Sequence, residues 1–252
     1  MDRQLYKIPF SDGNFPDWVC PTCQKGVLEL KKGTFTKDSS AMSKRDQDHP
    51  AWDPDWLSFV YSCFLICSNK SCKEAVSSCG TGFVDLYVEL NEHGVPDQEW
   101  GSFYTPSFFQ PHLVFFNITE NTPQNVVDEI HRSFSLFFCD PPSSSNHIRI
   151  SLEHLLTHLK VSKTVTTKDD KIRILNLHAR IEKMPREYKN LKDLLLAMKW
   201  LGNAGSHAEK TITVDDVMDS YEIMEVVLNE IFEKKMARAK KIAKKINKKK
   251  GP

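Results

Sequence analysis

The sequence predicts an α+β protein with a β domain over residues 1–118, an up-and-down bundle of four helices over residues 119–233, and a basic C-terminal tail, residues 234–252, that extends the last helix. Three observations predict this division. The first part is rich in aromatic residues, proline, glycine and cysteine, and its apolar runs are short. The second part carries apolar residues at helical spacing over long stretches. The tail holds ten Lys or Arg residues and no acid.

Length and charge limit the classes of protein to consider. A chain of 252 residues with 40% hydrophobic content can bury one large core or two modest ones. The net charge is +1, so the ten bases of the tail leave −9 on the residues before it. An acidic body with a basic end is typical of a chain that contacts nucleic acid, a membrane surface or an acidic partner through that end. No apolar run is long enough to span a membrane and residues 1–10 do not form a signal peptide, so we expect a cytosolic protein.

Two cysteine pairs predict a metal site in the β domain. One pair encloses a Pro-Thr turn, and the other encloses four turn-forming residues. An odd number of cysteines, seven, in a cytosolic chain fits metal ligation better than a disulfide framework. Four thiolates complete a tetrahedral site of the zinc-ribbon kind, and we predict a structural Zn²⁺ held by Cys20, Cys23, Cys67 and Cys72. The sequence leaves two alternatives open, namely ordinary buried cysteines, and replacement of one ligand by Cys63 or Cys79.

Short apolar runs between turn residues predict the strands of this domain. A strand over residues 59–66 leads into the second cysteine pair. Two further strands, residues 74–79 and 82–90, are separated by a predicted turn at Gly80-Thr81-Gly82. Prolines within residues 104–112 predict an extended connector, because each proline biases the residue before it away from helix.

Helical periodicity governs the chain after residue 119. The first helix begins with Thr122 as N-cap and Pro123 at the first helical position, and the Asp-Pro-Pro sequence at 140–142 ends it. The second helix begins within residues 143–146. Between the second and third helices we expect a loop over residues 162–170 and a short helix over 172–184.

The third and fourth helices end and begin at clear signals. The third ends at Gly202, because glycine suits the left-handed position after a helix. The fourth begins with Thr213 as N-cap and Asp216 three residues later, which is a capping box. A helix that continues to Lys248 is too long for one small bundle to cover, so its last turns project or find a partner. Ile242 and Ile246, four apart among lysines, keep a thin apolar line that suits such a partner.

The stretch W-L-G-N-A-G-S-H at residues 200–207 predicts a polar site between helices. It places Asn203 four residues before His207, and Arg149 and Glu153 are four apart on a flank of the second helix. A histidine can transfer protons near neutral pH, and arginine with asparagine can hold a phosphate or a developing oxyanion. These groups are the minimum for a metal-independent ribonuclease that uses the 2′-hydroxyl of its substrate as nucleophile. The alternative is structural, with a loop cap, a histidine bonded to a carbonyl and a buried ion pair.

Several motifs carry a resemblance to a known family. They are C-P-T-C, C-S-N-K-S-C-K-E, F-Y-T-P with F-F-Q-P, I-R-I-S-L-E-H-L-L and K-W-L-G-N-A-G-S-H-A. Together they resemble the bacterial domain-of-unknown-function family 4145, whose helical region is similar to the HEPN superfamily. The resemblance implies a HEPN-like bundle that dimerises, and many HEPN proteins are ribonucleases of toxin–antitoxin, restriction and phage-defence systems. The active sites of these HEPN ribonucleases use an arginine followed four to six residues later by a histidine.

The resemblance assigns roles to individual residues. His207 matches the superfamily histidine, and Asn203 matches the polar residue that follows the superfamily arginine. The arginine itself is missing, because its position is Gly202. We hypothesise that Arg149, with Glu153 beside it, supplies the charge from the neighbouring helix.

Two functions follow as expectations. The first is a HEPN-like RNA-binding or RNA-cleaving effector of a bacterial defence, toxin–antitoxin or restriction-linked system. In this function the zinc ribbon and the basic tail bind nucleic acid. The alternative is a non-catalytic dimeric adaptor or sensor that uses Zn²⁺ only for folding and binds a partner protein of such a system. For both functions we expect a homodimer that does not associate with a membrane.

Overall fold

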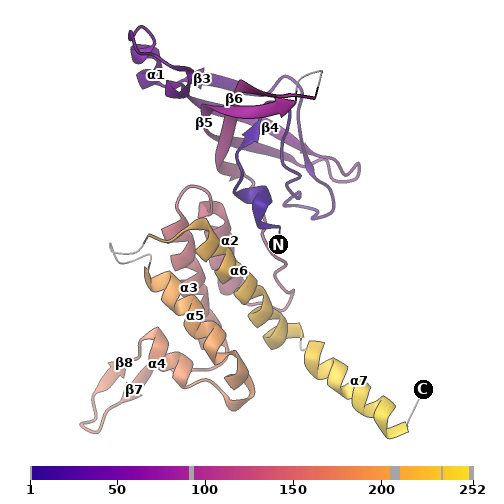
Figure 1. The fold of residues 1–252 in the computed structure, drawn as a ribbon. Coiled ribbons are helices and arrows are strands. Elements are labelled where there is room, and N and C mark those ends of the chain that lie inside the picture. The colour runs from indigo at the N-terminus through magenta and orange to yellow at the C-terminus, as the bar shows by residue number, and fades with distance from the viewer. Residues whose placement is uncertain (1, 91–93, 205–210, 234, 250–252) are drawn as a thin grey trace. The chain divides into compact units, whose positions relative to one another are not determined.

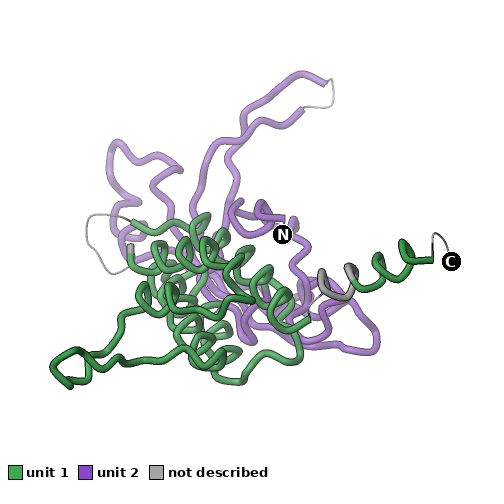
Figure 2. Tube along the Cα trace, turned by 90° about the horizontal axis from the view of Figure 1, so that it is seen from below, with its two compact units in different colours: residues 1, 115–252 green, residues 2–114 purple. Residues whose placement is uncertain are grey.

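In the computed structural model of the protein, the chain has a mixed α+β architecture (Figure 1). The structure describes residues 2–90, 94–204, 211–233 and 235–249. The chain divides into two compact units, residues 2–114 and residues 115–252 (Figure 2). The predicted α+β class is confirmed, because the first unit is built on an antiparallel sheet and the second is mainly helical.

The first unit is a curled antiparallel sheet with the strand order β1-β6-β5-β4-β2 (Figure 1). Both β2 and β3 pair with β4, at its C-terminal and N-terminal halves respectively. The strands are β1 (Phe10–Ser11), β2 (Leu28–Leu30), β3 (Thr36–Ser39), β4 (Ser58–Cys67), β5 (Ala75–Leu90) and β6 (Pro96–Gln110). The short helices of this unit are η1 (Arg3–Tyr6), α1 (Ala41–Asp46) and η2 (Pro54–Trp56).

Aromatic side chains fill the core of this unit. Tyr104 on β6 is fully buried, and its ring packs against Phe10 and Tyr61 at centroid distances of 5.5 Å. The Lys37 ammonium donates to the Tyr104 hydroxyl at 2.6 Å, so β3 and β6 are joined by a polar contact at the edge of the core. Rings of this size supply much of the apolar area that a small sheet can bury.

The strand predicted at residues 59–66 is confirmed as β4, but the turn predicted at residues 80–82 is wrong. β5 runs through these residues without reversing, with only a bulge after Cys79. Gly80 and Gly82 instead allow β6 to approach β5 closely. A Cβ at Gly80 would meet the Thr105 carbonyl oxygen, and a Cβ at Gly82 would lie 2.6 Å from the Tyr104 ring. The predicted connector at 104–112 is accordingly part of β6 as far as Gln110.

The second unit packs its helices around α3 (Figure 1). α3 contacts α2, α4, α5 and α6, and α5 contacts α6. The main helices are α2 (Gln124–Leu136), α3 (Pro141–His158), α5 (Lys192–Ala204), α6 (Val214–Leu228) and α7 (Lys235–Lys249). The remaining elements are β7 (Thr164–Thr166), β8 (Ile172–Ile174), α4 (Leu177–Glu182), the 3-10 helix η3 (Arg186–Leu191) and the π-helical turn η4 (Asn229–Glu233).

A buried hydrogen-bond network joins three of these helices. The Tyr221 hydroxyl of α6 lies 2.9 Å from the Ser133 hydroxyl of α2 and 3.0 Å from the Ser144 hydroxyl of α3. Burial raises the pKa of Tyr221 far above its usual value, so the phenol remains a neutral hydrogen-bonding group. These bonds satisfy polar groups that the helical core would otherwise leave without partners.

Several predicted boundaries in this unit are wrong by a few residues. Pro123 is the N-cap of α2, and the Thr122 hydroxyl pairs with Thr119 instead of capping. α3 begins at Pro141, because the Asp140 carboxylate accepts from the Ser143 amide. The segments predicted as a loop and a short helix contain the hairpin β7–β8, and the helix in them is confined to α4.

The start of α6 follows the prediction. Thr213 and Asp216 form a reciprocal capping box, in which each side chain accepts from the other residue's backbone amide. The continuous helix expected beyond it is interrupted, because α6 ends at Leu228 and η4 precedes α7. Among the described residues, no helix is long and apolar enough to cross a membrane.

Thr213→Ala should lower the stability of the helical unit by about 1 kcal/mol, because it leaves an amide of the first turn of α6 without its side-chain acceptor. Urea unfolding followed by circular dichroism at 222 nm measures this loss. Thr166→Ala, an exposed threonine on β7, is the control. Equal stability of the two variants would contradict a role for the capping box.

Candidate metal centre and helical site

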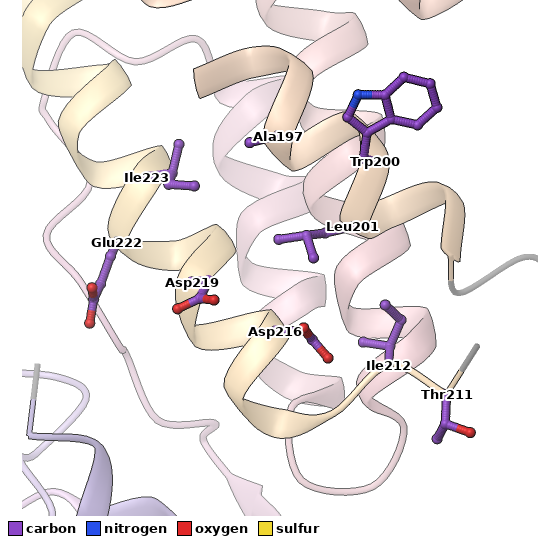
Figure 3. Close-up of a pocket in the computed structure, with 9 residues that line it drawn as sticks. All are labelled: Ala197, Trp200, Leu201, Thr211, Ile212, Asp216, Asp219, Glu222 and Ile223. Carbon is purple, nitrogen blue, oxygen red and sulfur yellow. The ribbon is translucent and has the colours of Figure 1, made fainter. Parts of the chain in front are cut away.

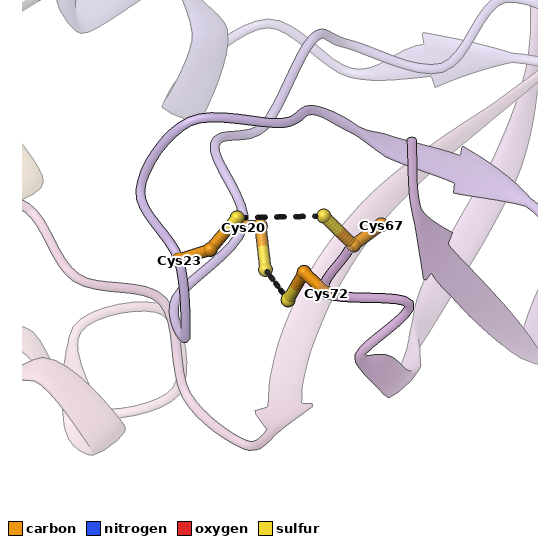
Figure 4. A group of neighbouring side chains, drawn as sticks. All are labelled: Cys20, Cys23, Cys67 and Cys72. Carbon is orange, nitrogen blue, oxygen red and sulfur yellow. Dashed lines mark hydrogen bonds between the residues drawn. The ribbon is translucent and has the colours of Figure 1, made fainter. Parts of the chain in front are cut away.

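Four cysteine sulfurs converge in the first unit (Figure 4). All four lie within 4.8 Å of one another and come from Cys20, Cys23, Cys67 and Cys72. The Cys20–Cys72 sulfur distance is 3.9 Å and the Cys23–Cys67 distance is 3.6 Å. A regular tetrahedron with metal–sulfur bonds of about 2.3 Å requires sulfurs about 3.8 Å apart. The spacing therefore fits four thiolates around one metal ion.

The two cysteine pairs sit on turns of the same kind. In the first turn the Gln24 amide donates to the Cys20 carbonyl, and in the second the Lys73 amide donates to the Asn69 carbonyl. Gln24 and Lys73 each follow the last cysteine of their turn and both have positive φ, 50° and 54°. This conformation reverses the chain sharply, so that a sulfur on each side of the turn reaches the same point.

The turns are also fastened to each other. The Ser68 amide donates to the Val27 carbonyl at 2.9 Å, and the Val27 amide donates to the Ser68 hydroxyl at 3.0 Å. Gly26 permits this contact, because a Cβ there would lie 2.7 Å from the Cys67 sulfur and 2.8 Å from the Asn69 amide nitrogen. Gly26 is not among the predicted site residues, although its position three residues after Cys23 in C-P-T-C-Q-K-G was a usable signal.

The four thiols differ in their electrostatic surroundings. Backbone amides of Gly26 and Lys25 lower the pKa of Cys23 to about 6, and the Asn69 side-chain amide donates to the same sulfur at 3.6 Å. Burial raises the pKa of Cys67 to about 12. Amide donors favour a thiolate, and a metal ion would supply the charge that keeps a buried sulfur deprotonated.

The other candidate ligands do not join this cluster. Cys63 is buried within β4 and Cys79 is exposed on β5, and in the described chain the metal-ligand cluster contains neither. The cysteines that the sequence singled out therefore lie together and could bind a metal ion.

A second polar site joins α3 to α5. The Arg149 Nε donates to the Asn203 side-chain oxygen at 2.9 Å, and an Arg149 terminal nitrogen lies 3.4 Å from the Glu153 carboxylate. The Arg149 side chain is 28% exposed, so solvent or a ligand reaches the guanidinium. Three of the four predicted residues are thus in contact. The fourth, His207, lies outside the described residues.

Gly202 explains how closely these two helices approach. The predicted helix end at this residue is wrong, because α5 continues to Ala204. Gly202 is buried, and a Cβ there would lie 2.6 Å from the Arg149 Cβ and 3.2 Å from the Ser145 carbonyl oxygen. The missing side chain leaves room for the stem of Arg149, which carries the guanidinium across to α5.

Lys199 adds a second cation to this site. It lies one turn before Asn203 on α5, it is buried, and its ammonium lies 3.3 Å from the centre of the Trp200 ring. Burial lowers the pKa of Lys199, and the positive charge of Arg149 lowers it further. The site therefore concentrates positive charge that an anion would stabilise. Lys199 is not among the predicted site residues, because spacing along one helix does not show that its ammonium lies near Arg149 of α3.

Comparison with protein families finds two matches. Residues 8–109 match the domain of unknown function DUF8608, and residues 131–249 match the domain of unknown function DUF4145. The first match covers the cysteine cluster, and the second covers the Arg149 and Asn203 site. No curated protein and no solved structure matches the chain.

Gly26→Ala should reduce metal binding, because the added methyl group would displace either the Cys67 sulfur or the second turn. We expect the purified variant to hold less than one metal ion per chain where the wild type holds one, measured by elemental analysis and thiol titration. Gly33→Ala is the control, because Gly33 has no atom within 4 Å of an added Cβ, although its positive φ makes the substitution strained. Full metal content in Gly26→Ala would contradict the packing argument.

Gly202→Ala should destabilise the helical unit, although alanine is the better helix former. The helix gains about 1 kcal/mol from the substitution, but forcing a methyl group into a close contact costs about 1–3 kcal/mol. Thermal unfolding of the variant should therefore begin at a lower temperature than that of the wild type. Asn203→Ala, which removes the hydrogen bond without adding volume, shows how much of the loss comes from the polar contact. A higher melting temperature for Gly202→Ala would contradict the close approach.

Proposed function

We propose that this chain, whose residues 131–249 belong to the DUF4145 family, is a HEPN-like RNA-binding or RNA-cleaving effector of a bacterial defence, toxin–antitoxin or restriction-linked system. The observation that carries the proposal is the guanidinium of Arg149, held beside Asn203 in the space that Gly202 leaves. It offers the phosphate-binding charge that the HEPN resemblance requires and that α5 itself lacks at Gly202.

The helical unit supports a HEPN-like arrangement. α2, α3, α5 and α6 are long helices, and α3 contacts the other three. Functional groups of a helical bundle come from facing helices, as Arg149 on α3 and Asn203 on α5 do here. We propose that these four helices are the bundle, that the protein works as a homodimer, and that α7 is its basic extension.

The proposed chemistry is cleavage of RNA without a metal in the active site. His207 removes the proton of a ribose 2′-hydroxyl, and that oxygen attacks the adjacent phosphorus as the bond to the 5′-oxygen breaks. The leaving 5′-oxygen takes up a proton from the solvent, and the products are a 2′,3′-cyclic phosphate and a 5′-hydroxyl. Arg149 and Lys199 stabilise the negative charge that develops on the phosphate oxygens. Asn203 holds Arg149 in place through its side-chain oxygen.

The surroundings of Arg149 allow a phosphate to bind. Its contact with Glu153 is long, at 3.4 Å, and both side chains are partly exposed. Such pairs are worth less than about 1 kcal/mol, so a phosphate can displace the carboxylate at small cost. The bond to Asn203 is shorter and uses Nε, which leaves the terminal nitrogens of the guanidinium for the phosphate.

For the first unit we propose a zinc-ribbon-like domain with one structural Zn²⁺. Four thiolates on two turns are the ligand set that Zn²⁺ prefers for structural sites, and the sulfur spacing fits its bond length. With all four positions taken by cysteine, no position is left for a substrate. The metal would hold the two turns together and take no part in the reaction.

A specific observation favours the alternative function, a non-catalytic zinc-containing adaptor or sensor that binds a partner protein. The distal halves of β5 and β6 form a two-stranded arm (Figure 2). Leu86 pairs with Trp100 on one face of this arm, and Val88 and Leu90 continue the face, all of them exposed. The opposite face carries Asp85, Glu89, Asp97 and Glu99. An apolar strip on an exposed arm is typical of a protein-binding surface.

The decisive experiment incubates the zinc-loaded protein, and in parallel the metal-free protein, with a mixture of tRNA and mRNA in a buffer to which no metal ion is added. We expect cleavage, with a loss of roughly 10²–10⁴-fold in rate for His207→Ala and of roughly 10²-fold for Arg149→Met. Methionine keeps the stem packed over Gly202 and removes only the charge. His178→Ala, an exposed histidine of the same unit, should cleave as the wild type does.

The products separate the two functions. A 2′,3′-cyclic phosphate end and no cleavage of a 2′-deoxy substrate are the expected results. If the wild type cleaves nothing at high concentration, the nuclease is rejected and the adaptor becomes the better account. If His207→Ala cleaves at the wild-type rate, the assigned active site is wrong.

A further inference from the structure

A groove of about 790 Å³ lies between α5 and α6, apart from the Arg149 site (Figure 3). Its apolar lining comes from Ala197, Trp200, Leu201, Ile212 and Ile223. Leu201 and Ile223 point into the space between the two helices. Trp200 is 58% exposed, and Val226, one turn after Ile223, is 54% exposed. Apolar surface of this kind between two helices suits the apolar face of a third helix.

The polar lining of the groove is acidic. Asp216, Asp219 and Glu222 all line it from α6, and among the described residues no base lines it. A row of carboxylates repels RNA, so the groove is no extension of the phosphate site. It favours a basic partner, because complementary charge selects and orients what binds.

α7 has the composition that this groove favours. The side chains of residues 241–249 are exposed at every position, and they include five lysines and no acid. Ile242 and Ile246 are 52% and 48% exposed, and their spacing of four places them on one face of the helix. At 100° per residue, Lys245 and Lys249 flank this face, while Lys244 and Lys248 lie on the opposite side.

We propose that α7 of a second copy of this chain lies in the groove between α5 and α6. Ile242 and Ile246 contact Leu201, Ile223 and the Trp200 ring, and Lys245 and Lys249 face the carboxylates of α6. Lys244 and Lys248 remain on the outer side, where they can contact phosphates. The inference rests on the homodimer of the proposed function and names the surface through which its two copies meet.

A second copy is a better occupant than the same chain. α7 follows η4 with a single intervening residue, Lys234, whereas two helices that fold back on each other need a connection of two to five residues. Because residues 241–249 are exposed, this part of α7 does not cover the groove of its own chain. If each copy inserts its α7 into the other, the exchange closes with two-fold symmetry and stops at a dimer.

Sedimentation velocity of the full chain over a range of concentrations tests the interface. Lys245→Glu with Lys249→Glu should weaken the dimer at least tenfold. Lys244→Glu with Lys248→Glu, the same charge change on the opposite side of the same helix, should leave the dimer unchanged and reduce retention on RNA. A loss of RNA retention without a change of the dimer in the first variant would overturn the inference, because α7 would then serve RNA alone.

A charge exchange between two chains distinguishes docking in a second copy from docking within one chain. The variant with Asp219→Lys and Glu222→Lys should also be monomeric, since it reverses the charge of the groove. Mixed with the Lys245→Glu and Lys249→Glu chain, it should form a heterodimer, because each tail then meets a groove of opposite charge. No heterodimer in the mixture would overturn the inference, as would a dimer that neither variant weakens.

The outcomes distinguish a failure of the proposed interface from a failure of the proposed homodimer. A wild type that is monomeric at every concentration rejects the homodimer and the interface together. A dimer insensitive to these variants rejects only the interface. Circular dichroism and metal content confirm that each variant is folded. Ile172→Asp, at an exposed isoleucine on β8, is the control for a change of surface charge and should remain dimeric.

Discussion

The close approach of α3 and α5 at Gly202 is the constraint on which the helical unit depends. Because Gly202 has no side chain, the stem of Arg149 fills the position that a Cβ would take, and its guanidinium reaches Asn203. The same approach buries Lys199 near Arg149, which lowers the pKa of the lysine. One missing side chain therefore determines both the helix packing and the positive charge of the site. Any larger residue at this position would separate the helices or displace the arginine.

The sequence predicts the features that arise from neighbouring residues. The capping box of Thr213 and Asp216 forms as expected, because its partners lie within one helical turn. Each cysteine pair is predicted for a related reason, since each pair sits on a turn whose geometry is local. Even the pairing of Arg149 with Glu153 follows from a spacing of four on one helix. In each case the chemistry and the spacing are visible in a short stretch of sequence.

Features that depend on distant contacts are predicted less well. Glycine is ambiguous, because it suits both a turn and a close approach, and only the packing partner decides between them. Gly80 and Gly82 lie within a strand against β6, and Gly202 lies within a helix against α3, where turns or a helix end were predicted. The hairpin β7–β8 was missed because Ile172 and Ile174 are exposed, so their apolar character does not reveal a buried face.

The Arg149 site and the groove carry opposite charges and share α5. Arg149 and Lys199 place positive charge at the contact of α3 with α5, whereas the groove between α5 and α6 is lined by carboxylates. α5 therefore has one side suited to an anion and another suited to a cationic helix. A basic α7 bound only to RNA would leave its isoleucine pair exposed to water, and a neutral apolar helix in the groove would bring no positive charge to the acidic side of α6. A helix that carries both isoleucines and lysines satisfies both surfaces at once, while its outer lysines stay accessible to a phosphate backbone.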